Sequence, residues 1–282
     1  MIEVIDRLPT YPGRVKLIPV PGQPDTYDMI RADEPLVAGT PINRALFESI
    51  SVELDALHQN VANLINSHAS VSPIGSLPAG AEFGIYENNI LVPFIKVSGD
   101  YNGTGRSAVM RKHIYKRDFL TTSDQNNVYA NSLTDTWLNT EYLSMLDSYV
   151  RGGIANVAVP CTVGDGDPTL EEIQRKVFLP SLTEMGLTDD WYSIEGTPFP
   201  YFNSYARRKA LFNGSAMFYW TRSPHYSYTN MSAYINGDGT HSTDSAYSLQ
   251  AGIRPLFTLP HDFEVNMTAA SATNVAATAE VI

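Results

Sequence analysis

The stretch FYWTRSP at residues 218–224 and the shorter stretch GIRP at residues 252–255 enclose a segment of different character. Both flanks combine bulky side chains with proline or glycine, which is typical of buried framework. The enclosed residues 225–248 are dominated by Tyr, Ser, Asn, Thr, His, Asp and Gly. Antibody binding loops have a similar composition, because tyrosine gives rigid contact area and small polar residues give adaptable hydrogen bonds. The pattern favours a recognition surface; a plain polar loop, or tyrosines alternating inward as strand core, are the alternatives.

The surrounding residues 81–260 predict a compact α+β domain with long loops. Residues 90–97 form a dense apolar run typical of a strand, and residues 132–149 have apolar side chains at helical spacing. A second helix is expected at residues 170–176, because the run from Thr169 to Glu172 has the spacing of a capping box. Mixed short elements of this kind indicate an α+β fold and argue against a doubly wound sheet.

Residues 42–69 predict a long helix with a heptad seam. Thr40 suits the N-cap, and Pro41 suits the first helical position. Apolar residues recur at alternating spacings of three and four, at Phe47, Ile50, Leu54, Leu57, Val61 and Leu64. This seam favours a short parallel coiled coil that joins three chains, with a single amphipathic helix packed on its own domain as the alternative. Because so short a coiled coil is marginal alone, flanking domains must help to hold it.

The other segments complete a five-part organisation. Residues 1–41 carry short β-type runs broken by proline and glycine, which predicts strands without a sizeable core of their own. Residues 70–80 are rich in Ser, Pro and Gly, which indicates a linker. Residues 261–282 form a C-terminal extension with an Ala/Thr-rich end, for which a strand added at a subunit interface and a flexible tail are both open.

The net charge of -11 at pH 7 limits the partners of the chain. A phosphate backbone would be repelled by this field, so nucleic acid is not expected as a partner. With the single cysteine Cys161 the chain cannot form an intrachain disulfide. Residues 1–6 lack the character of a signal peptide, and no apolar run approaches the roughly 20 residues that span a bilayer. We therefore expect neither a cleaved leader nor membrane insertion.

Motifs for catalysis and cofactor binding are absent from the sequence. It contains no Walker-type phosphate loop, no dinucleotide-binding glycine turn, no His-Glu-x-x-His and no Gly-x-Ser-x-Gly elbow. The six histidines have no metal-ligand spacing. Residues 165–170 begin like an EF-hand loop but place Leu170 where glycine is required, and residues 236–239 suit a tight turn. We expect no enzyme activity, no cofactor and no metal.

Four short motifs resemble a domain found widely in bacterial and phage proteins of the gut. They are Thr136-Trp137-Leu138-Asn139, Val177-Phe178-Leu179-Pro180-Ser181, Trp220-Thr221-Arg222-Ser223-Pro224 and Gly252-Ile253-Arg254-Pro255. That domain is similar to the C-type-lectin-like fold shared by formylglycine-generating enzymes and by the variable proteins of diversity-generating retroelements, of the major tropism determinant type. The resemblance covers residues 75–260. It implies a C-type-lectin-like fold, but Cys161 alone cannot supply the copper-binding cysteine pair of the enzymes.

The N-terminal part resembles the start of tail proteins from phages of Gram-positive bacteria, on residues 11–15, 27–35 and 39–41. Together the resemblances imply a phage tail-tip adhesin that is made in the host cytoplasm and carried in the virion. Residues 1–70 would bind other phage tail proteins, and the C-terminal domain would bind a bacterial surface glycan or protein. A sugar would be held by tyrosine stacking without a shared calcium ion. The alternative function is a structural baseplate or tail component whose C-terminal domain packs on another virion subunit.

The resemblance also implies which residues vary and which stay fixed. In retroelement-diversified proteins, adenine-directed changes convert Asn codons into codons for Tyr, Ser, His, Asp, Thr, Ile or Gly. Receptor-binding positions that fit this alphabet are Tyr226, Tyr228, Asn230, Ser232, Tyr234, Asn236, His241, Thr243, Asp244 and Tyr247. The fixed scaffold would be Trp220, Arg222, Gly252 and Arg254. Sequences of the gene from sibling phages test this hypothesis, which fails if these codons carry no adenine-directed changes.

Overall fold

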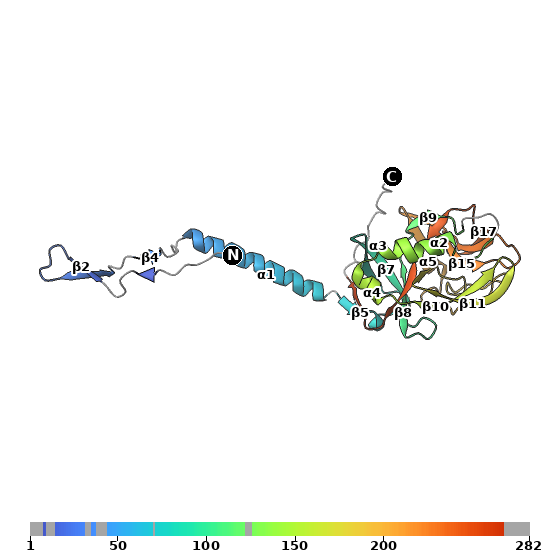
Figure 1. The fold of residues 1–282 in the computed structure, drawn as a ribbon, viewed down its shortest axis with the longest axis horizontal. Helices are drawn as coiled ribbons and strands as arrows, with labels where there is room; N and C mark the ends of the chain where they lie inside the picture. The colour runs from blue at the N-terminus through green and yellow to red at the C-terminus, as the bar shows by residue number, and fades with distance from the viewer. Residues whose placement is uncertain are drawn as a thin grey trace. The chain divides into compact units, whose positions relative to one another are not determined.

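A computed structural model describes residues 8–9, 15–31, 35–37, 44–69, 71–121 and 126–267. The chain divides into two compact units, Met1–Ser67 (unit 1) and His68–Ile282 (unit 2) (Figure 1). Strands account for 39% and helices for 19% of the described residues, so this part of the chain is mixed, with sheet predominating. This content is compatible with the α+β class expected from the sequence.

Unit 1 contains two small antiparallel strand pairs and one long helix. The strands are β1 (Leu8–Pro9), β2 (Val15–Pro19), β3 (Tyr27–Arg31) and β4 (Pro35–Val37). β1 pairs with β4, and β2 pairs with β3. Leu17 and Met29 face each other across the second pair, yet they are 57% and 70% exposed. The strands predicted within residues 1–41 are therefore present, and none of the described side chains at residues 17–29 is buried.

The long helix α1 (Arg44–Ala69) confirms the helix predicted at residues 42–69, while Thr40 and Pro41 lie outside the described residues. Its seam residues Phe47, Ile50, Leu54, Leu57 and Val61 are between 45% and 63% exposed. The side chain of Leu64 lies outside the described part. An exposed apolar seam is the surface that a coiled coil would bury, and the trimer stays a prediction. In the described parts of the chain, no helix has the length and hydropathy needed to cross a membrane.

Unit 2 is built on a seven-stranded antiparallel sheet. In spatial order its strands are β12 (Val177–Phe178), β19 (Leu256–Pro260), β8 (Arg106–Arg111), β7 (Ile90–Ser98), β6 (Glu82–Glu87), β20 (Glu264–Asn266) and β5 (Val71–Pro73). β7 confirms the strand predicted at residues 90–97. The sheet brings the first and last described strands of unit 2 together, because β5 pairs with β20.

The linker predicted at residues 70–80 is wrong. Residues 71–73 form β5, and Ile74 in the following short helix η1 (Ile74–Ser76) is fully buried. The Ile74 amide donates to the carbonyl of Phe263 at 2.8 Å. Ser, Pro and Gly here shape an edge strand and a turn, so the folded unit begins before residue 81 and extends past residue 260 to β20. Of the predicted extension, residues 268–282 lie outside the described part.

A second sheet of five strands carries the motif flanks. In spatial order its strands are β17 (His241–Ser245), β16 (Met231–Ile235), β15 (Tyr219–Pro224), β18 (Ala251–Ile253) and β9 (Lys116–Asp118). β15 runs parallel to β18, with Tyr219 beside Gly252, and the other pairs are antiparallel. The two framework stretches therefore lie side by side in the middle of the sheet, and the segment between them forms β16 and the edge strand β17.

A broken helical run covers residues 133–153. It consists of α2 (Leu133–Trp137), the π-helical turn η2 (Leu138–Tyr142), α3 (Leu143–Met145) and α4 (Ser148–Gly153). The Ser132 side chain caps α2 by accepting a hydrogen bond from the Asp135 amide at 3.2 Å. Helical structure predicted at residues 132–149 is thereby confirmed, with the break between α3 and α4 at Leu146.

The helix predicted at residues 170–176 is wrong. Residues 167–175 form β11 (Asp167–Arg175), which pairs along its length with β10 (Val157–Gly164). Gly166 has φ 86°, a backbone conformation that closes the hairpin turn. The Thr169 amide donates to Asp167 at 2.8 Å, so the apparent capping residues serve the turn instead. Shorter elements complete the unit: α5 (Tyr205–Arg208), β13 (Ala210–Phe212) and β14 (Ser215–Met217).

Two apolar clusters form the core of unit 2, one on each face of the five-stranded sheet. Neighbouring residues of β15 point to different clusters: Trp220 joins the cluster around Phe94 and Phe257, and Tyr219 joins the cluster around Phe178. Because successive strand residues alternate between faces, both faces of β15 are buried. All six residues of this strand are buried.

Candidate functional site

The predicted receptor-binding residues differ in exposure. Tyr228 is 56% exposed and Tyr247 is 36% exposed. A further group is partly buried: Tyr226, Asn230, Tyr234, Asn236, His241, Thr243 and Asp244. Residues 236–239 form the expected turn, in which the Gly239 amide donates to the Asn236 carbonyl at 2.9 Å. The segment therefore offers a partly open surface.

Two of the predicted receptor-binding residues point inward. Ser232 has no exposed surface, and Tyr234 packs on Trp220 and Phe218, with ring centroids 6.0 and 5.5 Å away. Both lie on the same face of β16, which packs on the core around Trp220, so Ser232 has no solvent exposure and Tyr234 keeps only part of its surface open. The prediction that Ser232 contacts a receptor is wrong for this reason.

Six ring-bearing side chains, four from residues 225–248 and two from the loop at residues 191–192, lie close together. We call them the aromatic–histidine cluster: Trp191, Tyr192, His225, Tyr226, Tyr228 and His241. The rings of Trp191 and His225 stack, with centroids 5.5 Å apart and planes 16° apart. The Tyr228 ring lies 4.7 Å from His225, and Tyr192 meets His225 edge-on at 5.4 Å. Trp191 is 51% exposed. The cluster thus combines a buried histidine with exposed aromatic rings.

His225 is the fixed centre of the cluster. Only 5% of it is exposed, and its Nδ1 accepts hydrogen bonds from the amides of Ser227 at 3.1 Å and Tyr228 at 3.2 Å. Burial lowers the pKa of His225, in keeping with an unprotonated Nδ1 that acts as acceptor. The ring therefore folds the loop after β15 back on itself and supports the indole of Trp191.

Asp189 ties the loop before Trp191 to the edge strand β17. Its Oδ1 accepts the Trp191 amide at 3.0 Å, and its Oδ2 lies 3.2 Å from His241 Nε2. The hydrogen bond from the Trp191 amide is the main cause that lowers the pKa of Asp189. The hydroxyl groups of Tyr192 and Thr243 make a second hydrogen bond between the same segments. His241 and Thr243, both predicted site residues, thus hold the cluster together.

Asn127 joins three segments beneath the cluster, and nothing in the sequence marked it. It has no exposed surface, and its Nδ2 donates to the carbonyls of His225 at 3.0 Å, Tyr228 at 3.0 Å and Met231 at 2.6 Å. Its Oδ1 accepts the Asp165 amide at 2.7 Å. One amide side chain therefore connects the loop 225–231 to the tip of the β10–β11 hairpin.

A shallow hollow of about 330 Å³ is lined by the residues on either side of Trp191 in the chain. Its polar lining includes Thr188, Asp189, Asp190, Tyr192 and Ser193. The Ser193 hydroxyl donates to the Pro168 carbonyl in β11 at 2.8 Å, so the hairpin also borders this region. Trp191, Tyr192 and Asp189 were missed by sequence reasoning, because they lie far along the chain from residues 225–248.

The profile of a protein family described as a domain of unknown function (DUF6273) matches residues 104–261, more than half of the chain. The protein belongs to the DUF6273 family. The match includes the whole aromatic–histidine cluster, the five-stranded sheet and the β10–β11 hairpin, and it leaves out unit 1. Searches of curated proteins and of solved structures gave no match.

Buried charge supports the cluster from within the DUF6273 domain. Arg222 and Glu184 are both fully buried and form a two-bond pair, at 2.6 Å from Nη1 and 2.8 Å from Nη2. Arg222 also donates to the carbonyls of Pro160 and Leu179. Glu195, likewise unexposed, accepts the Thr162 amide at 2.7 Å, and burial raises its pKa. These bonds connect β15 to β10 and to the loop that carries Trp191.

The other expected scaffold residues are also buried. Trp220 and Arg254 are 0% and 1% exposed, and Arg254 donates to the Arg111 carbonyl at 2.8 Å and the Tyr219 hydroxyl at 3.1 Å. A side chain on Gly252 would collide with Ile114, 2.6 Å from the added Cβ. All four residues therefore occupy interior positions of the DUF6273 domain.

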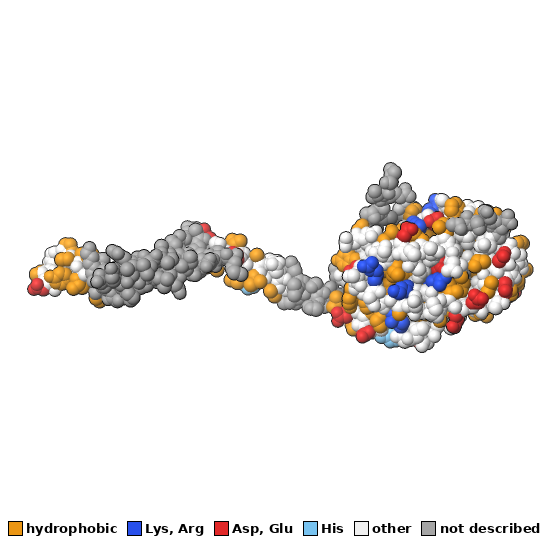
Figure 2. Space-filling view, viewed as in Figure 1, with side chains coloured by type: hydrophobic (Ala, Val, Ile, Leu, Met, Phe, Trp, Pro, Cys, Tyr) orange, Lys and Arg blue, Asp and Glu red, His pale blue; other side chains and the backbone are white. Residues whose placement is uncertain are grey.

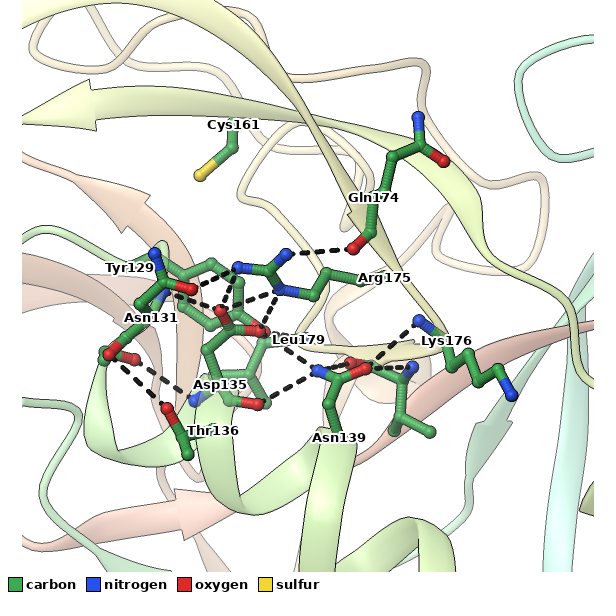
Figure 3. Close-up of polar contacts among 12 residues, drawn as sticks. Tyr129, Asn131, Asp135, Thr136, Asn139, Cys161, Gln174, Arg175, Lys176 and Leu179 are labelled. Atoms are coloured by element: carbon green, nitrogen blue, oxygen red, sulfur yellow. Dashed lines mark hydrogen bonds and ion pairs between the residues drawn. The ribbon is translucent and has the colours of Figure 1, made fainter.

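A second polar hollow, of about 450 Å³, lies over α2 and the end of β11. Figure 3 shows Asp135, Asn139 and Arg175 pointing toward one another there. Arg175 donates to both Asp135 oxygens at 2.8 Å, and Asn139 accepts the amides of Lys176 and Val177. The polar groups of this network are hydrogen-bonded to one another, so we interpret it as a structural connection between the helix and the strand, which we call the Asn139 latch. It gives a role to Asn139 of the motif at residues 136–139 and connects it to the backbone of Val177, the first residue of the motif at residues 177–181.

The described residues offer little for covalent or metal chemistry. Within them, no three His, Cys, Asp or Glu side chains are grouped as metal ligands would be. Cys161 is buried, and burial raises its pKa to about 12, which suppresses the reactive thiolate. Exposed rings, hydroxyls and carboxylates around Trp191 are suited to binding a partner by stacking and hydrogen bonding.

Proposed function

We propose that this DUF6273 protein is an adhesin of a phage tail tip, which binds a bacterial surface receptor through the aromatic–histidine cluster. The proposal is carried by one observation. Trp191 and Tyr228 are each about half exposed, yet the rings of both pack on the buried ring of His225, which holds them in place. Large aromatic side chains held in place before binding lose little conformational entropy on contact. They are also the side chains that most often dominate binding energy.

The fold proposed for unit 2 is C-type-lectin-like. It is supported by the places of the quoted motifs: two lie side by side as β15 and β18, and two meet at the Asn139 latch. Buried residues that cannot vary, beside a partly open segment between β15 and β18, suit a scaffold that carries a surface of variable sequence.

Trimerisation through α1 is part of the same proposal. The seam of α1 leaves five large apolar side chains exposed, more than a single soluble helix would retain without a partner. Three copies of a weakly binding surface would gain roughly 10² to 10⁴-fold in avidity if all can engage at once.

The proposal is tested by adsorption of the purified full chain to whole cells of gut Gram-positive strains. The variant Tyr226→Ala/Tyr228→Ala removes two rings of the cluster, and we expect it to lose strain-selective binding, because the rings provide the contact area. Tyr86→Ala is the matched control, since Tyr86 is a 42% exposed tyrosine in β6, outside the cluster.

Two results would contradict the adhesin. The double variant could bind as well as the Tyr86→Ala control, which would remove the cluster from recognition. Alternatively, the folded, oligomeric wild-type chain could bind no strain. That outcome favours a structural baseplate or tail component, whose aromatic rings pack on another virion subunit.

A further inference from the structure

Trp191 presents one free face of its indole ring. The ring centroids of Trp191, His225 and Tyr226 are separated by 5.5, 5.8 and 6.1 Å, which makes a nearly equilateral triangle. If His225 and Tyr226 covered opposite faces of the indole, their own centroids would lie about twice as far apart. Tyr226 therefore sits at the edge of the stacked pair, so neither ring covers the face of Trp191 opposite His225, and the 51% exposure of Trp191 fits an open face there.

The ring of Trp191 stacks on the buried ring of His225, and the backbone that carries it is held by two hydrogen bonds. The Trp191 amide donates to Asp189 at 3.0 Å, and its carbonyl accepts the Tyr226 amide at 3.2 Å. The other two tryptophans of the chain, Trp137 and Trp220, are only 8% and 0% exposed. A flat, rigid and solvent-facing indole is the feature on which the apolar face of a sugar ring stacks.

The surroundings of Trp191 are acidic. The hollow beside it has Asp189 and Asp190 in its lining and no Lys or Arg. The tip of the β10–β11 hairpin adds Asp165 and Asp167 near the loop that carries Tyr226, where a Cβ on Gly166 would lie 3.9 Å from the Tyr226 carbonyl oxygen. Figure 2 shows acidic side chains spread over the part of unit 2 where Figure 1 labels β10 and β11.

Carboxylates beside an aromatic platform select the charge of a ligand. Sugar hydroxyls donate charge-assisted hydrogen bonds to carboxylates, and an ammonium group is attracted both to them and to the indole face. A phosphate, sulfate or uronate group would be repelled by the negative charge of these carboxylates. The combination therefore accepts neutral or amino-bearing sugars and rejects acidic ones.

We infer that the receptor is a neutral or amino-bearing glycan, one ring of which stacks on the free face of Trp191 while its hydroxyls reach Asp189 and Asp190. This inference rests on the proposed adhesin function. It narrows the receptor to a carbohydrate and places the contact on a loop outside residues 225–248.

The test uses the full chain and cells of a strain that the wild type binds. Trp191→Ala should lower the apparent affinity roughly thirtyfold or more, as truncation of a central aromatic contact does. Trp191→Phe keeps a flat ring and should lose only a few-fold. Tyr86→Ala should bind like the wild type, and near-ultraviolet circular dichroism checks that each variant is folded. Mild periodate treatment of the cells should abolish binding, and protease treatment should leave it unchanged.

Added trisaccharides test the charge preference through competition. Tri-N-acetylchitotriose, which is neutral, and chitotriose, which bears amines, are compared with trigalacturonate, which is anionic. Competition by either of the first two supports the inference. Competition by the anion alone overturns it.

The outcomes separate the two proposals. Loss of binding after protease but not periodate identifies a protein receptor and overturns the glycan, while the adhesin stands. Wild-type affinity of Trp191→Ala likewise overturns the Trp191 platform alone. If the wild-type chain binds no strain, the adhesin function itself fails.

Discussion

His113 is a partly buried titratable side chain, and its surroundings disfavour the protonated form of its ring. Its pKa is lowered from 6.5 to about 4, mainly because the ring is removed from water and next because Lys112 is positively charged. Its Nδ1 is buried without a hydrogen-bond partner. Because the folded state binds the proton less readily than the unfolded chain, His113 leaves stability intact above pH 6.5 and reduces it as the pH falls toward 4.

We therefore expect His113→Gln to reduce the loss of stability between pH 6.5 and pH 4. The free energy of unfolding of the wild type should fall, relative to the variant, by about 3 kcal/mol between pH 7 and pH 4. Urea unfolding at both pH values, followed by near-ultraviolet circular dichroism, measures the difference. His261→Gln, at an exposed histidine, is the matched control for the substitution itself. An equal acid loss in His113→Gln and the wild type would contradict the assignment.

At the residue scale, the sequence identified the interior scaffold better than the surface. Trp220, Arg222 and Arg254 stand in compact motifs with proline and glycine, and all three are buried. Asn127 and Trp191 escaped notice because their roles depend on contacts across the chain: Asn127 reaches the His225 carbonyl over 98 residues. Local composition carries no trace of such contacts.

At the scale of elements, the Asn127 side chain makes the loop 225–231 and the β10–β11 hairpin depend on each other. Asn127→Ala removes the donor to the His225 carbonyl and the acceptor of the Asp165 amide, while the carbonyls of Tyr228 and Met231 keep backbone donors. The loss should cost about 1–3 kcal/mol of stability. We expect faster hydrogen exchange at the Asp165 amide, which donates to Asn127 in the wild type, and weaker binding to cells.

Hydrogen exchange with mass spectrometry on the full chain provides the measurement. Asn156→Ala is the matched control, because Asn156 is exposed and lies in the second hollow. It should leave exchange in residues 163–167 and 225–231 unchanged. If Asn127→Ala exchanges at the wild-type rate in both segments, they are held independently of this side chain.

Element prediction failed where pairing partners are distant or local signals are ambiguous. Residues 170–176 have good helix formers and the spacing of a capping box, yet pairing with β10 overrides these local preferences. Residues 71–73 look like a linker because their partner, β20, lies at the other end of unit 2. The strand at 90–97 and the helix at 42–69 were predictable, because each pattern is long and regular.

At the scale of the whole molecule, recognition by weak surfaces depends on the number of copies. The seam of α1 is the one long apolar stripe among the described residues of unit 1, and its burial between three helices would hold three binding surfaces on one base. Aspartate at Leu54 and Leu57 would place charges inside that seam, where they cannot be paired or hydrated.

We expect Leu54→Asp/Leu57→Asp to convert the proposed trimer to monomers of 31.1 kDa, as measured by multi-angle light scattering. Val52→Asp adds a charge to the same helix at a 69% exposed position away from the seam, and it should remain trimeric. Near-ultraviolet circular dichroism of unit 2 should be the same in both variants, since its core does not include α1. Cell adsorption of the monomer should fall by roughly 10² to 10⁴-fold, because avidity is lost while each surface stays intact. A double variant that stays oligomeric would show that the chains associate elsewhere, and α1 would then be an amphipathic helix without a role in assembly.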